Sequence, residues 1–123
     1  MAQEALFIVA AVLLVGWGIA HLVPTRSVVR GFGDITLDNR RIITMEWVVE
    51  GVALVSLGAV TAILAVDPSE PLARAVGLTV FVALNALSAV SILTGAKIRF
   101  LPFRLCPVIF TGSSILVLAG SLL

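Results

Sequence analysis

Two acidic side chains stand at the head of a long apolar run, in the stretch TMEWVVEG at residues 44–51. Glu46 and Glu50 are four residues apart, so a helix places both on one face. A carboxylate near the centre of a bilayer costs about 2.5–3.5 kcal/mol, and the cost falls toward the interface. Glu50 therefore needs a proton, a cation or water beside it. Such an acid is a candidate for binding a ligand or exchanging a proton.

Other polar and aromatic side chains interrupt the apolar runs in the same half of the membrane. We expect them to meet the acids in a shared interior between helices. The candidate ligand-binding set is Trp17, His21, Glu46, Trp47, Glu50, Asn85, Ser88 and Arg104. The chain has one histidine, so the second histidine usual beside carboxylates at a metal site is missing, and no metal site is predicted. Nothing in the set supplies an activated nucleophile or an oxyanion hole, so no catalytic residue is predicted and a non-catalytic role is favoured.

Several of these candidates also have a purely structural explanation. Glu46 can form an ion pair with Arg99 or Arg104 that fixes the register of two helices. Asn85 and Ser88 can form hydrogen bonds that hold membrane helices together. Tryptophans are common packing residues at membrane interfaces. The sequence leaves these explanations open beside the binding site.

Four apolar runs must position these side chains. The 123-residue chain is 60% hydrophobic and has a mean hydropathy of +1.19, whereas about half of the residues are apolar in soluble domains. A membrane-spanning helix needs about 20 mostly apolar residues. The runs that meet this requirement are residues 5–23, 42–66, 72–94 and 101–123, and the second is expected to belong to a helix over residues 38–66. The sequence predicts an all-α polytopic membrane protein, a four-transmembrane-helix bundle that forms a single domain over residues 1–123.

Basic residues gather in two of the three connections. Seven of the eight lie in residues 24–41 and 95–104, and short loops rich in arginine and lysine stay in the cytoplasm. We expect these loops to be cytoplasmic and both termini to face outward, most simply in a bacterial inner membrane. The net charge of +1, with the arginines flanking the membrane, excludes a dedicated nucleic-acid surface.

The longest connection, residues 25–44, has the sequence TRSVVRGFGDITLDNRRIIT. Its GFGD core predicts a turn, after which Thr36 or Asp38 caps the second long helix. A helix that starts there is about 28 residues long and stands partly outside the membrane. At the last run, Pro107 indicates either a late start of the helix or a kink.

Two stretches of the first two runs resemble a known family. GWGIAHLVP at residues 16–24 and MEWVVEGVALVSLG at residues 45–58 are similar to the DoxX-like superfamily of small four-helix membrane proteins. The resemblance implies an accessory membrane subunit associated with redox systems, such as thiosulfate-to-quinone electron transfer or thiol-stress complexes. The residues that carry over are Gly18, His21, Pro24, Glu50, Gly51 and Gly58. A histidine replaces the expected basic residue at the end of the first helix, and the lone Cys106 cannot serve as a redox pair, so direct thiol chemistry is not expected.

The residues and the resemblance together favour a non-catalytic integral membrane subunit, or a binding protein for a small molecule such as a quinone or lipid. Its polar pocket would lie near the cytoplasmic side and no other cofactor is expected. The alternative is a proton-coupled transporter of a small molecule that uses Glu50. Expected partners are the lipid bilayer, a small-molecule ligand, and a membrane protein or second copy of the chain.

Overall fold

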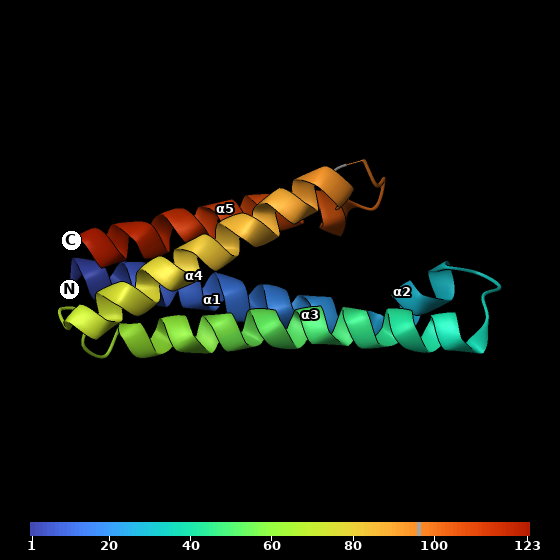
Figure 1. The fold of residues 1–123 in the computed structure, drawn as a ribbon, viewed down its shortest axis with the longest axis horizontal. Helices are drawn as coiled ribbons and strands as arrows, with labels where there is room; N and C mark the ends of the chain where they lie inside the picture. Colours follow the sequence, from blue (N-terminus) through green and yellow to red (C-terminus); the bar gives the residue numbers. More distant parts are fainter. Residues whose placement is uncertain (96) are drawn as a thin grey trace.

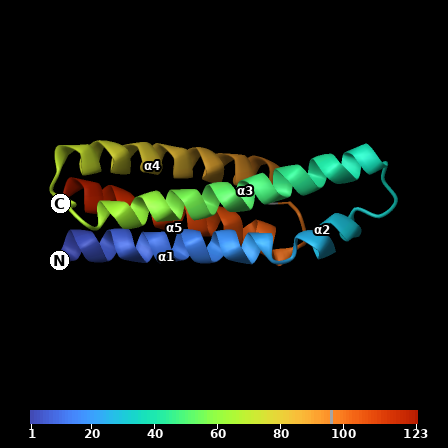
Figure 2. The same cartoon turned by 90° about the horizontal axis from the view of Figure 1, so that it is seen from below.

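Four long helices run side by side through the structure, a computed structural model that describes residues 1–95 and 97–123 (Figures 1 and 2). The elements are α1 (Ala2–Leu22), α2 (Thr25–Gly31), α3 (Leu37–Leu64), α4 (Pro71–Val90), a π-helical turn (Ser91–Gly95) and α5 (Leu101–Leu122). The helices α1, α3, α4 with its π turn, and α5 are long and apolar enough to cross a membrane. The predicted all-α membrane bundle is confirmed, and the protein is an integral membrane protein.

The bundle consists of two helical hairpins. The first pairs α1 with α3 and the second pairs α4 with α5, while α1 also packs against α5 and so joins the two hairpins. Contacts between α3 and α4 are sparse. Both termini lie at one end of the bundle beside the α3–α4 connection, and α2 lies at the other end (Figure 1). Four crossings therefore return the chain to the side on which it began, and which side this is stays a prediction.

Glycines let α1 and α3 approach closely. A Cβ atom placed on Gly18 would lie 2.9 Å from the backbone nitrogen of Val55, and one on Gly58 would lie 2.9 Å from that of Val15. Real Cβ atoms do not come so close to backbone, so neither position accepts a side chain without separating the helices. Membrane helices commonly pack through small residues in this way. This contact fixes α1 against α3 along most of its length.

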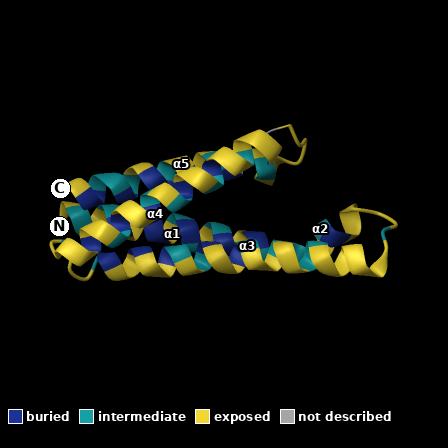
Figure 3. Ribbon diagram, in the orientation of Figure 1, coloured by how far each residue is buried: buried dark blue, intermediate teal, exposed yellow. Residues whose placement is uncertain are grey.

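The larger hydrophobic cluster lies in the half of the bundle that contains the termini, and a smaller one is formed by Leu54, Cys106 and Phe110. Phe7, Leu14, Leu84 and Val117 in the larger cluster have no more than a trace of exposed surface. The outward faces carry exposed aliphatic side chains, as a lipid-facing surface requires (Figure 3). Toward the opposite end the α4–α5 hairpin diverges from α1 and α3 (Figure 1).

The connection between α1 and α3 agrees with the prediction except for the short helix α2. The capping prediction is confirmed, because the Thr36 hydroxyl accepts a hydrogen bond from the Asn39 backbone nitrogen (3.2 Å) and α3 is 28 residues long. The turn prediction is confirmed at Gly33, whose φ of 72° favours glycine. The sequence analysis missed α2, which is too short to give a periodic signal. A late start of the last helix is wrong, because α5 begins at Leu101 and includes Pro107.

Candidate functional site

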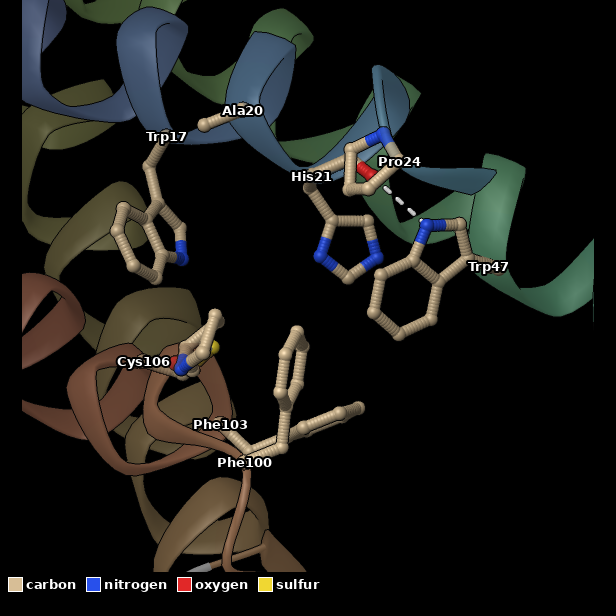
Figure 4. A pocket seen from close by; sticks show the side chains of 9 residues that line it. Trp17, Ala20, His21, Pro24, Trp47, Phe100, Phe103 and Cys106 are labelled. Atoms are coloured by element: carbon tan, nitrogen blue, oxygen red, sulfur yellow. Dashed lines mark hydrogen bonds between the residues drawn. The ribbon is translucent and has the colours of Figure 1, made fainter. Parts of the chain in front are cut away.

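A small cavity opens where the two hairpins diverge. It has a volume of about 120 Å³ and lies between the last turns of α1, the first half of α3 and the start of α5 (Figure 4). Its walls are formed by Trp17, Ala20, His21, Pro24, Trp47, Phe100, Pro102, Phe103 and Cys106. Most of these side chains are aromatic or apolar, so the pocket is walled by rings rather than by charges.

Trp47 joins α1 to α3 and α5 at this pocket. Its ring stacks on the His21 imidazole with 3.8 Å between centroids and 15° between planes. Its indole Nε1–H donates a hydrogen bond of 2.7 Å to the His21 carbonyl oxygen at the end of α1. The Phe103 ring on α5 packs against Trp47 in an edge-to-face arrangement, with 5.5 Å between the ring centroids. One side chain therefore holds three helices in place around the cavity.

Glu50 reaches the pocket through His21. Its Oε2 lies 3.5 Å from the Nε2 of His21, whose side chain is 6% exposed, whereas the Glu50 side chain is 40% exposed. Because Nε2 faces Glu50, Nδ1 is the imidazole nitrogen on the side of Trp17 (Figure 4). The contact is not a hydrogen bond of good geometry, since Nε2 is buried without a hydrogen-bond partner among the described residues. The nearby carboxylate still favours the tautomer that carries its proton on Nε2, which leaves Nδ1 as an acceptor toward the pocket.

Trp17 supplies the second polar group of the pocket wall. Within the described part of the chain its indole Nε1 is buried and forms no hydrogen bond of good geometry, and the neighbouring Cys106 sulfur is only a weak acceptor. Figure 4 shows this nitrogen on the side of the ring that faces His21. Leaving a buried donor unpaired costs about 1–3 kcal/mol, so such a group calls for an acceptor. Trp17 and His21 thus present a donor and an acceptor to the same small space.

The structure brings only part of the predicted set together. Trp17, His21 and Trp47 line the cavity and Glu50 touches His21. Glu46 lies one helical turn closer to the start of α3, beyond the end of α1, and is exposed.

The other three predicted residues lie away from the cavity. Arg104 is exposed on α5, and neither it nor Arg99 forms an ion pair with Glu46 in residues 1–95 and 97–123. Asn85 is exposed on α4, where its side-chain nitrogen donates to the Phe81 carbonyl oxygen of its own helix (2.8 Å). Ser88 is buried between α4 and α5.

Ser88 joins the two helices of the second hairpin. Its hydroxyl lies 2.8 Å from that of Thr111 and donates a longer bond, 3.4 Å, to the Pro107 carbonyl oxygen. A hydroxyl that finds both partners on the neighbouring helix has little capacity left for a ligand. The interhelical role that the sequence left open for this residue is the one observed.

The sequence analysis missed the wall that α5 and the preceding loop contribute. Phe100, Phe103 and Cys106 follow one another at intervals of three residues, which places them along one face at the start of α5. This spacing is a usable sequence signal for the aromatic wall of the pocket, whereas the positions of polar residues do not indicate it.

No group of three or more histidine, cysteine, aspartate and glutamate side chains comes together in the part of the chain that the structure describes. No family model, curated relative or solved structure matches the chain.

Proposed function

We propose that the protein binds a small planar ring that carries an oxygen, such as the head group of a quinone, in the aromatic pocket between α1, α3 and α5. The observation that carries this proposal is the buried Trp17 Nε1–H on the wall of a ring-sized cavity, which forms no hydrogen bond of good geometry in the described chain. A carbonyl oxygen of the ligand would accept from this group. The ligand would enter from the bilayer and its tail would remain among the lipids.

The size of the cavity favours a single ring. An apolar cavity of about 150 Å³ is known to hold one benzene molecule. The cavity here is about 120 Å³, so it suits one six-membered ring and not a fused ring system. The flat faces of Trp47 and Phe103 offer stacking and edge contacts to such a ring.

The polar groups favour a ligand with oxygen atoms. The indole of Trp17 donates, and His21 offers Nδ1 as an acceptor, so the quinone carbonyl and the hydroxyl of its reduced form both find a partner. The N–H group of Trp17 also makes this pocket unlike the aromatic cages that bind quaternary ammonium ions. A cation would meet the positive end of the N–H dipole.

An accessory role beside a redox system extends the proposal. It rests on the resemblance of residues 16–24 and 45–58 to the DoxX-like superfamily. Of the residues that carry the resemblance, Gly18 and Gly58 lie at the α1–α3 contact, while His21 and Pro24 line the pocket and Glu50 contacts His21. The motif and the pocket thus occupy the same region of the bundle.

Proton-coupled transport through Glu50 is the second candidate. The 3.5 Å contact between Glu50 and His21 supports it, since a carboxylate and an imidazole can exchange a proton. The pocket supports it less, because Glu50 is not among the side chains that line the cavity. Binding of a neutral ring is therefore preferred.

Quenching of tryptophan fluorescence tests the binding proposal directly. The chain has two tryptophans and both line the pocket, so a quinone that stacks there should quench nearly all of the emission. Titration of the protein in lipid nanodiscs with a short-tailed benzoquinone should give a saturable signal. Ala20→Phe, which fills the pocket from its wall, should abolish the saturable part. Val12→Phe, two turns earlier on α1 and 66% exposed, should leave it unchanged. Equal quenching in all three proteins would contradict a specific site.

Trp17→Phe tests the hydrogen bond separately from the ring. The phenyl ring retains the wall of the pocket and removes the donor, and Trp47 remains as the reporter. One hydrogen bond contributes about 0.5–1.5 kcal/mol, so the affinity for the benzoquinone should fall by about 3- to 10-fold. An alkylbenzene with the same tail should compete equally well for both proteins, because it carries no acceptor. A quinone affinity that is unchanged by the substitution would remove the proposed role of Trp17.

A further inference from the structure

Beside the aromatic pocket, a second concavity gathers positive charge at the same end of the bundle. It has a volume of about 190 Å³ and lies between α2 and the first turns of α3. Its lining consists of Thr25, Arg26, Val29, Arg30, Arg40 and Thr44. Three arginines therefore contribute to the lining of one small space, and no carboxylate is among the lining side chains.

Local structure explains why the arginines meet. Arg26 and Arg30 are four residues apart on α2, so they share one helical face. The buried Val29 lies on the α3 side of that helix and is part of the same lining. The turn at Gly33 then reverses the chain, and the Thr36 cap starts α3 so that Arg40 on its first turn lies opposite α2.

The three arginines form no ion pair within residues 1–95 and 97–123. Among the residues described, the ion pair nearest in sequence is Arg41–Asp38, and none involves Arg26, Arg30 or Arg40. Like charges held together repel one another, and a bound anion removes this cost. The planar guanidinium fork matches the oxygens of a phosphate group better than any other common anion except a carboxylate.

A shallow apolar surface of α3 continues from this concavity. It is formed by Arg40, Arg41, Thr44, Met45, Val48 and Val49, so it shares Arg40 and Thr44 with the basic site and then runs along α3 over aliphatic side chains. Met45 and Val49 are more than half exposed. A free phosphate ion would make no favourable contact with this apolar surface, whereas the acyl chain of a phospholipid can pack along it.

We infer that Arg26, Arg30 and Arg40 bind the phosphate of an anionic phospholipid headgroup, with an acyl chain along Met45, Val48 and Val49. The site lies just beyond the end of α1 at Leu22, which is the level of the lipid phosphates in a bilayer that the apolar helices span. Basic pockets beside membrane helices bind headgroups by the same chemistry. This site is separate from the aromatic pocket and holds whether or not a quinone binds there.

Native mass spectrometry of the protein released from micelles tests the inference. Phosphatidylglycerol should remain bound in preference to phosphatidylcholine. Each of the substitutions Arg26→Gln, Arg30→Gln and Arg40→Gln should weaken phosphatidylglycerol binding by about fivefold, and the triple variant should lose the preference. The control is the triple variant Lys97→Gln, Arg99→Gln, Arg104→Gln, which removes the same charge from the other connection at this end and should retain the preference.

Three results would overturn the inference. The absence of any preference for phosphatidylglycerol in the unmodified protein would exclude the site. An equal loss in the control variant would show a diffuse effect of charge rather than a site. Inorganic phosphate that binds as tightly as the lipid would assign the arginines to a soluble anion. The single variants keep the test decisive if a triple variant fails to fold, because each of them changes one exposed side chain.

Discussion

Gly18→Ala is expected to destabilise the bundle by about 1–3 kcal/mol, the usual cost of overpacking a tight contact. Gly16→Ala, two residues earlier on the same helix, is expected to be neutral or slightly stabilising. The new Cβ at position 18 would lie 2.8 Å from the Val55 side chain and 2.9 Å from the Val55 backbone nitrogen, whereas one at position 16 would meet nothing within 4 Å. Thermal unfolding in detergent, followed by circular dichroism, measures the difference.

The same substitution should weaken the pocket. Gly18 precedes His21 by one helical turn, so a shift of α1 away from α3 lengthens the hydrogen bond from Trp47 to the His21 carbonyl oxygen. Quinone affinity should therefore fall in Gly18→Ala and not in Gly16→Ala. Gly58→Ala, which meets the backbone of Val15, should behave like Gly18→Ala. Equal melting temperatures for the variants at positions 16 and 18 would contradict the close α1–α3 contact.

The four spanning helices were predictable because the bilayer sets one simple requirement. An apolar run of about 20 residues meets it, and all four runs appear as helices whose ends differ by only a few residues from the prediction. The helix α2 has seven residues and gives no such run. Its position depends on Val29 packing against α3, which is a tertiary contact.

The site was predicted only in part. The spacing of residues along the sequence shows which side chains share a face of one helix, but it does not show which neighbouring helix that face contacts. The buried face of α4 follows Gly77, Val80, Leu84 and Ser88. Asn85 is one residue beyond Leu84 and thus about 100° around the helix, which turns it outward. Spacing alone had grouped it with Ser88.

For Glu46, the sequence also does not show which residues of the neighbouring helix lie at the same height along the bundle. It shares a face with Glu50, but α1 ends at Leu22, so only Glu50 has a residue of α1 opposite it. Depth counted from sequence had placed both acids within the membrane half that the pocket occupies. The relative lengths and offsets of packed helices are set by their contacts, and a single sequence does not contain them.

Trp47→Ala is expected to lower both the stability of the bundle and the affinity for the benzoquinone. It removes the ring that stacks on His21, the edge contact with Phe103 and the hydrogen bond to the His21 carbonyl oxygen. Tryptophan-to-alanine changes in cores cost about 3–5 kcal/mol, and the half-buried position of Trp47 places the expected cost near the lower end. The affinity for the benzoquinone, read from the remaining Trp17, should fall at least about tenfold, since ring stacking contributes about 0.5–1.5 kcal/mol beyond the buried area.

Trp47→Phe distinguishes the role of the Trp47 ring as a wall of the pocket from the role of its hydrogen bond in helix packing. The phenyl ring retains an aromatic face toward His21 and Phe103 but cannot donate to the His21 carbonyl oxygen, so we expect a loss of about 1 kcal/mol in stability and a smaller loss of affinity than in Trp47→Ala. If both variants lost stability equally but bound the quinone like the unmodified protein, Trp47 would contribute to helix packing and not to ligand binding. If Trp47→Ala alone lost the ligand, the ring itself would form the wall, because the hydrogen bond is absent from both variants.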